Sequence, residues 1–189
     1  ITRSDAVAAV RTARALREQG FDVGPVIATR DRAYVDRIDE RFVRQCRFYY
    51  ASLESVEDVL DLPLDDVLKI AVYAFGDAES ECHEPLSAAV PGVQTVVSGA
   101  HWVDMMARTA SKGRALAAVQ ERLGITPAQT AVFGDYLNDA ELYDRAELSF
   151  AMANAHPGIL SRARYIAPAN TDDGVLRTIE ALLDRLSPR

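Results

Sequence analysis

The sequence contains few cysteines, no excess of basic residues and no long apolar run, and each absence excludes a class of protein. Its two cysteines, Cys46 and Cys82, form no Cys-x-x-Cys pair and fit no zinc-ligand spacing, which argues against a disulfide scaffold or a zinc site. The net charge of −7 offers no basic surface to a nucleic-acid backbone. Because no apolar stretch could span a bilayer and the start lacks a signal-peptide pattern, we predict a soluble cytoplasmic protein with no nucleic-acid or membrane partner.

Lysine is also scarce: 19 of the 21 basic residues are arginine, and the two lysines are Lys69 and Lys112. Lys112 follows Ser111 at the predicted start of a helix, where a cation opposes the helix dipole. A lysine at that position either binds a nearby anion, a carboxylate or a phosphate, or is a solvated surface residue. The preference for arginine elsewhere favours the first interpretation, because a lysine ammonium is a compact charge suited to a tetrahedral phosphate.

The 189 residues, 49% apolar and 26% charged, are enough for one good-sized domain or two small ones with a hydrophobic core. In the first part of the chain, hydrophobic periodicity and turn residues predict a mixed α+β arrangement. The predicted helices cover 5–19, 34–46, 55–62 and 78–90, and the predicted strands cover 21–29, 48–51, 67–73, 93–98 and 102–107.

After residue 107, helices and strands alternate along the chain. The predicted helices cover 111–123, 138–145, 156–163 and 171–186, and the predicted strands cover 130–133, 148–152 and 165–167. This alternation indicates right-handed crossovers and a parallel sheet. We therefore predict an α/β protein with an α+β domain over 1–102 and the C-terminal half of a Rossmann-like parallel sheet over 103–189.

The segment from Gly134 to Asp139, directly after a predicted strand, has the strongest functional signal. In an open α/β sheet, ligands bind beyond the carboxyl ends of the strands. Asp135 follows the strand end, and Asn138 and Asp139 begin the next helix, where amide groups favour an anion. Two carboxylates and an amide suit a hard cation such as Mg²⁺. The same residues are also typical of an Asx turn followed by an ordinary helix cap, and the motif alone does not decide between these interpretations.

Several ordered motifs resemble haloacid dehalogenase-like hydrolases of the Cof type, which carry a type IIB cap. In the second part of the chain the matching segments are Val103–Met106, Ser111–Leu116, Leu123–Ile125, Val132–Asp135, Asn138–Asp139, Ala151–Ala155 and Asn170–Val175. In the first part they are Asp65–Tyr73 and Val96–Gly99, which resemble the cap. The resemblance implies that 1–102 is the cap and 103–189 the C-terminal part of the hydrolase core.

The resemblance also implies a Mg²⁺-dependent phosphomonoesterase that acts on a small phosphorylated metabolite, such as a sugar phosphate, through an aspartyl-phosphate. Lys112 matches the lysine that steadies the phosphate and the nucleophile. Asp135 matches the Mg²⁺ ligand, and Asn138 the amide that bonds the phosphoryl group or the waters of the metal. Asp139 matches the carboxylate that orients the lysine and the metal-bound water. The resemblance implies nothing about the oligomeric state.

The family's first motif, Asp-x-Asp-x-Thr, which supplies the nucleophile, does not occur in the sequence. Thr29 could stand in for the second-motif hydroxyl, but the strand before it is better interpreted as part of the cap. Because the chain begins at Ile1, we expect a cap and half a core of a larger phosphatase, inactive by itself. The alternative is a catalytically inactive phosphate- and Mg²⁺-binding or assembly protein with the same fold. A nucleotide-binding module is less favoured, because no glycine-rich phosphate loop is present.

Overall fold

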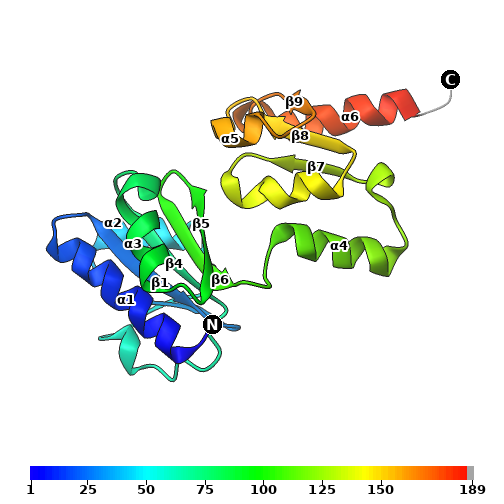
Figure 1. The fold of residues 1–189 in the computed structure, drawn as a ribbon. Helices are drawn as coiled ribbons and strands as arrows, with labels where there is room; N and C mark the ends of the chain where they lie inside the picture. The colour runs from blue at the N-terminus through cyan, green and yellow to red at the C-terminus, as the bar shows by residue number, and fades with distance from the viewer. Residues whose placement is uncertain (187–189) are drawn as a thin grey trace. The chain divides into compact units, whose positions relative to one another are not determined.

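The computed structural model describes residues 1–186, which form two compact units. The first unit is Ile1–Arg108, and the second begins at Thr109. Figure 1 shows the elements of both. The predicted division at residue 102 cuts through strand β6 (Trp102–Ala107), and the boundary is corrected to Arg108 because all of β6 pairs within the first unit.

The first unit is built on a six-stranded mixed sheet with the strand order β3-β2-β1-β4-β6-β5. Its strands are β1 (Val23–Ala28), β2 (Ala33–Val35), β3 (Leu53–Ser55), β4 (Lys69–Ala74), β5 (Val93–Gly99) and β6. Its helical segments are α1 (Arg3–Glu18), α2 (Glu40–Arg47), η1 (Val59–Asp61), η2 (Glu79–His83) and α3 (Glu84–Ala89). All neighbouring strands are antiparallel except β2 and β3.

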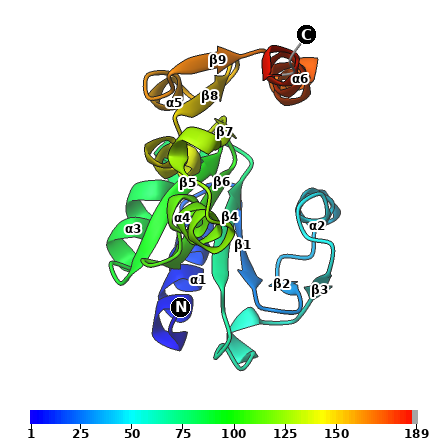
Figure 2. The same cartoon turned by 90° about the vertical axis from the view of Figure 1, so that its right-hand side faces the viewer.

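Helices cover the two faces of this sheet unequally. In Figure 2, α1 and α3 lie on one side of the strands and α2 lies on the other. The larger core joins the apolar stripe of α1, including Val10 and Leu16, to sheet residues such as Ile70 and Val72. The smaller core lies under α2, where Phe42 packs with Tyr73 and Trp102.

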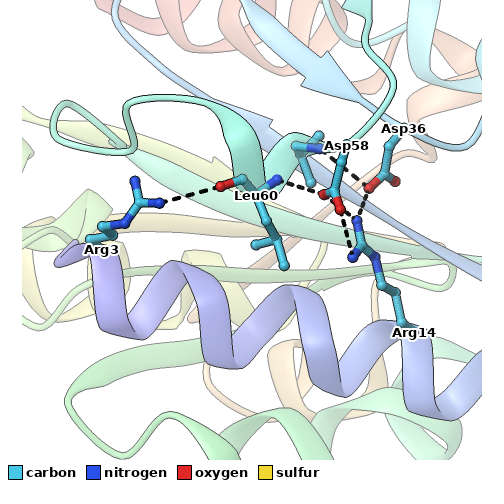
Figure 3. Close-up of polar contacts among 6 residues, drawn as sticks. Arg3, Arg14, Asp36, Asp58 and Leu60 are labelled. Atoms are coloured by element: carbon cyan, nitrogen blue, oxygen red, sulfur yellow. Dashed lines mark hydrogen bonds and ion pairs between the residues drawn. The ribbon is translucent and has the colours of Figure 1, made fainter.

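Two arginines attach α1 to the loop around η1 (Figure 3). The Arg14 guanidinium donates to Asp36 and, at 2.6 Å, to Asp58. Arg3 donates to the carbonyl oxygens of Leu60 at 3.3 Å and Leu62 at 3.0 Å. These contacts fix a loop that contributes little regular secondary structure of its own.

The second unit has a three-stranded parallel sheet with the order β7-β8-β9. Its strands are β7 (Ala131–Gly134), β8 (Leu148–Met152) and β9 (Tyr165–Ala167). Its helical segments are α4 (Lys112–Leu123), η3 (Pro127–Gln129), η4 (Leu137–Arg145), α5 (Pro157–Leu160), η5 (Asn170–Asp172) and α6 (Gly174–Leu186). Both the parallel sheet and the α/β class agree with the sequence prediction.

Three predictions in the first unit were wrong. The helix expected over 34–46 begins only at Glu40, after its cap Asp39. Residues 33–35 form β2 instead, because they pair with β1 and β3. The strand expected over 48–51 is absent: the amides of Tyr49 and Tyr50 both donate to the Cys46 carbonyl at 3.0 Å and so end α2 in a turn. The helix expected over 55–62 is reduced to η1.

Cys46 and Cys82 are both free and buried, and burial raises the pKa of each thiol to about 12. No helix within residues 1–186 combines the length and apolarity needed to cross a membrane.

Candidate active site

The polar residues predicted from the sequence lie where β7 ends. Gly134 is the last residue of β7, and the exposed Asp135 follows it directly. Because β7, β8 and β9 are parallel, their carboxyl ends share one edge of the sheet, where ligands of open α/β sheets bind. Asn138 and Asp139 lie in the first turn of η4, beside this edge.

Lys112 and Asp139 form an ion pair that holds the site together. The Lys112 ammonium donates to Oδ1 of Asp139, and the side chains are 51% and 7% exposed. Oδ2 of Asp139 accepts hydrogen bonds from the amides of Asp135 at 3.0 Å and Tyr136 at 3.5 Å. The carboxylate therefore fixes both the lysine and the turn after β7. The half-exposed ammonium keeps donors that can reach an anion.

The position of Lys112 at the start of α4 follows from its neighbours. Ser111 caps the helix by accepting from the Arg114 amide at 3.2 Å, and its hydroxyl donates to the Glu141 carboxylate. A side chain at Gly113 could not fit, because an added Cβ would lie 2.6 Å from Cβ of Glu141. The start of α4 thus lies tightly against η4, the element that carries Asp139, the partner of Lys112.

Gly134 allows a second close approach. A Cβ added there would lie 2.7 Å from Cβ of Asp139 and 2.9 Å from the hydroxyl oxygen of Tyr143. That hydroxyl lies within hydrogen-bonding distance of the carbonyl oxygens of Gly134 at 3.2 Å and Phe150 at 3.3 Å. Burial, together with the charges of Asp139 and Asp135, raises the pKa of Tyr143 to about 12, so the phenol stays protonated as a donor.

The fit of this site to a metal ion is partial. Within residues 1–186, no group of three or more His, Cys, Asp or Glu side chains is placed to hold a metal ion. Asp135 offers one exposed carboxylate, while both oxygens of Asp139 are already engaged. Oδ1 of Asn138 is buried without a hydrogen-bond partner in the described part of the chain. Such a set suits an ion such as Mg²⁺, which keeps several waters and takes one or two protein carboxylates.

Four further residues at the same edge were not predicted as site residues. The amide of His156 donates to the Asp135 carbonyl at 2.8 Å, and the His156 ring lies 5.2 Å from that of Tyr136. Asn154 follows β8 and Asn170 follows β9, and two hydrogen bonds join them. Nδ2 of Asn154 donates to Oδ1 of Asn170 at 2.9 Å, and the backbone amide of Asn170 donates to Oδ1 of Asn154 at 3.2 Å. Their position just after strand ends is the signal that could have identified them.

Thr29 lies in the first unit, whereas the residues described above lie in the second. It follows β1, which pairs in antiparallel fashion with β2 and β4 in the sheet of the first unit, and its hydroxyl donates to the Arg32 carbonyl at 2.9 Å. Its role in a turn of that sheet agrees with the interpretation of 21–29 as a strand of the first unit.

Known proteins are similar to this chain in sequence and in fold. Residues 4–179 match the family model described as haloacid dehalogenase-like hydrolase. The chain is 27% identical over 169 residues to the 5-amino-6-(5-phospho-D-ribitylamino)uracil phosphatase YbjI of Escherichia coli, a match that covers 88% of this chain and 62% of that protein. It is 37% identical over 91 residues to the phosphoglycolate phosphatase of Archaeoglobus fulgidus, covering 48% of this chain and 40% of that protein.

Two solved structures show the same fold. A protein from Streptococcus mutans UA159 superimposes with a TM-score of 0.84 at 23% identity, covering 97% of this chain and 68% of that one. A sugar phosphatase of haloacid dehalogenase subclass IIB superimposes with a TM-score of 0.72 at 18% identity, covering 96% and 67%. The chain spans less than two thirds of the length of the curated relatives named above. The match over most of its residues establishes that the chain belongs to the haloacid dehalogenase-like hydrolase family.

Proposed function

We propose that the second unit forms the phosphate- and metal-binding part of a phosphomonoesterase site. The observation that carries the proposal is the ion pair in which the buried Asp139 holds Lys112 at the N-terminus of α4. Because the carboxylate is fixed from behind by two backbone amides, the ammonium is positioned before any ligand binds. A preorganised cation at a helix N-terminus is an arrangement that stabilises a phosphoryl group.

Each predicted residue has a distinct role in this proposal. Lys112 donates to a phosphoryl oxygen. Asn138 supplies a buried amide oxygen that has no hydrogen-bond partner within residues 1–186 and can accept from a water held by the metal. Asp135 is the carboxylate that would hold Mg²⁺, and Asp139 is a positioning residue. When bound, Mg²⁺ would polarise a phosphoryl oxygen and neutralise its charge.

We propose that the substrate is a small phosphorylated metabolite, such as a sugar phosphate. The named relatives include phosphatases of a phosphorylated ribitylaminouracil and of phosphoglycolate, and a sugar phosphatase of subclass IIB shares the fold. Under this proposal the first unit is the cap, the second is the C-terminal part of the core, and the protein works in the cytoplasm.

A second candidate is a binding protein with the same phosphate site and no turnover. Hydrolysis through an aspartyl-phosphate needs a nucleophilic aspartate, and the motif Asp-x-Asp-x-Thr is absent from these 189 residues. Both candidates predict phosphate binding at Lys112, and they differ in catalysis. We propose that the 189-residue chain alone binds phosphate without hydrolysing its esters.

Isothermal titration of the chain with inorganic phosphate in the presence of Mg²⁺ tests the shared part of the proposal. Lys112→Met should weaken phosphate binding by roughly 10- to 100-fold, because it removes a charge-assisted hydrogen bond of about 1.5–3 kcal/mol. Arg114→Met, which removes an exposed charge two residues further along α4, is the matched control and should bind like the parent chain. Equal binding by the Lys112 variant would refute the proposed role of this residue.

Steady-state hydrolysis separates the two candidates. The chain is incubated with Mg²⁺ and a panel of phosphomonoesters, and released phosphate is measured. We expect no turnover above the level of a Lys112→Met sample. Turnover that depends on Lys112 would show that a nucleophile is present among the 189 residues and that the chain alone is an enzyme.

A further inference from the structure

A hollow of about 430 Å³ lies in the second unit at the amino ends of its parallel strands. Glu147 and Ser149 line it at the start of β8, and Arg164 lines it just before β9. The amino ends of parallel strands share one edge of a sheet, so this hollow lies at the edge opposite Asp135. It is therefore separate from the phosphate site proposed above, and its volume is within the range of small-molecule pockets.

Four charged side chains of both signs line the hollow. The Arg162 guanidinium lies 3.9 Å from the Asp144 carboxylate, and these side chains are 51% and 69% exposed. Arg164 lies beside Glu147, because its guanidinium donates to the Glu147 carbonyl oxygen at 3.5 Å. Two cations and two anions thus surround the same space, and their charges cancel.

These charged groups make few hydrogen bonds of their own. A guanidinium carries five N–H donors, and a carboxylate can accept about four hydrogen bonds. Among the described residues, the bond to the Glu147 carbonyl is the one hydrogen bond from either guanidinium, and neither the Asp144 nor the Glu147 carboxylate accepts any. An exposed pair at such a distance contributes little to stability. Most donors and acceptors around the hollow are therefore available to a ligand.

A buried hydroxyl group also lines the hollow. Ser149 is 1% exposed, and its Oγ accepts from the Arg164 amide at 3.2 Å. The pairing of Phe150 with Tyr165 sets these two preceding residues side by side. Within residues 1–186, the hydroxyl proton of Ser149 has no acceptor. A buried donor without an acceptor is unfavourable, so an acceptor atom of a ligand would stabilise it.

We propose that the second unit binds a zwitterionic ligand, an aliphatic amino acid, in this hollow. The carboxylate of the ligand accepts from the two guanidiniums, Arg162 and Arg164, whose planar forks match a carboxylate. It also accepts from the Ser149 hydroxyl. The ammonium of the ligand donates to the carboxylates of Asp144 and Glu147.

The balance of charge selects this class of ligand. A simple anion would meet the two carboxylates of the hollow, and a simple cation would meet the two guanidiniums, whereas a zwitterion offers each of them the opposite charge. The rest of the lining includes Pro127, Tyr143 and Ala146, and this apolar surface suits an aliphatic side chain. The inference does not rest on the phosphate chemistry proposed for Lys112.

A nuclear magnetic resonance titration tests the proposal, because the backbone amides of Glu147 and Arg164 report on the hollow itself. The isotope-labelled full chain is titrated with L-leucine and with two analogues of it. The first, 4-methylpentanoate, lacks the ammonium, and the second, 3-methylbutylamine, lacks the carboxylate. We expect L-leucine to shift these amide signals saturably, with a Kd of roughly 10 mM or tighter for a ligand of so few atoms. Each analogue should bind at least about tenfold more weakly.

Variants of the lining then assign the contacts. Arg162→Met and Asp144→Asn should each weaken L-leucine binding about tenfold or more, and both should fold because the replaced side chains are exposed. Ser149→Ala removes only the buried hydroxyl and should weaken binding roughly threefold to tenfold. Arg145→Met is the matched control, because Arg145 is exposed next to Asp144 in the sequence but does not line the hollow. It should bind L-leucine like the parent chain.

The dispersion of the amide signals establishes which variants are folded before they are compared. The proposal is overturned if L-leucine causes no saturable shift at Glu147 and Arg164, or if either analogue binds as tightly as L-leucine. It is also overturned if the Arg162 and Asp144 variants both bind like the parent chain. None of these results bears on phosphate binding at Lys112, which is measured separately, so the proposed function stands or falls by itself.

Discussion

Replacement of Gly134 by alanine should damage the second unit and its phosphate site together. The new Cβ would lie 2.7 Å from Cβ of Asp139, 2.9 Å from the Tyr143 hydroxyl and 3.0 Å from Oδ2 of Asp139. Carbon atoms in contact prefer about 3.5–4.0 Å, so Asp139 must move by several tenths of an ångström or more. Overpacking of this kind typically lowers the free energy of unfolding by about 1–3 kcal/mol. For a unit of this size, we expect the midpoint of thermal unfolding to fall by roughly 10 °C.

The displacement of Asp139 also predicts a loss of function. Asp139 holds the Lys112 ammonium, so a shifted carboxylate should weaken phosphate binding about tenfold or more.

Two measurements follow the Gly134→Ala variant. Far-UV circular dichroism monitors both units, whereas Trp102 fluorescence monitors only the first and should not change its midpoint. Gly99→Ala is the control for circular dichroism and phosphate binding, because a Cβ there would meet only the Trp102 ring, at an ordinary contact distance of 3.8 Å. If Gly134→Ala has the same unfolding midpoint and the same phosphate affinity as the parent chain, the close approach of β7 to Asp139 is not what holds Lys112 in place.

Three other predictions concern stability. Arg14→Met should lower the free energy of unfolding of the first unit by about 2 kcal/mol, because it leaves the 7%-exposed carboxylate of Asp36 without its ion-pair partner. Urea denaturation measures the effect, and the control Arg11→Met, at an exposed position, should stay within about 0.5 kcal/mol of the parent. The hydrogen bond from Arg14 lowers the pKa of Asp58, so the stability that it contributes is present at neutral pH and is lost as the pH falls below about 5. The free energy of unfolding should therefore depend less on pH in this range in Arg14→Met, and an unchanged dependence would contradict this interpretation. Phosphate at ten times its Kd for the parent chain should raise the free energy of unfolding of the second unit by about 1.4 kcal/mol, and Lys112→Met should reduce this gain to about 0.4 kcal/mol or less at the same concentration.

The sequence predicts the second unit better than the first, and the reason is the range of the interactions. In the second unit each strand is followed by its own helical segment, so local periodicity carries the topology. Asp135, Asn138 and Asp139 lie in one turn, and only the meeting of Lys112 with Asp139 required contact over 27 residues. That contact was implied by the resemblance to a family rather than by periodicity.

In the first unit, tertiary contacts override local signals. The spacing of Tyr34, Ile38 and Phe42 is helical, but β2 forms because residues 33 and 34 pair with β1. The aromatic run around Tyr49 and Tyr50 has high strand propensity, yet its rings pack on Trp102 from a turn. The pairing of Lys69 with Asp104 depends on the register of β4 and β6, which periodicity does not specify.

The scarcity of lysine has a practical chemical consequence. The only two side-chain amines of the 189 residues belong to Lys69 and Lys112, and both side chains are partly exposed. An acylating reagent that reacts with primary amines would modify the two lysines and leave the arginines, and so most of the positive charge, unchanged. It would remove the charge of each lysine, and peptide mass spectrometry would assign each modification to a single position. Shielding of Lys112, but not of Lys69, by phosphate would then map the proposed phosphate site without any mutation.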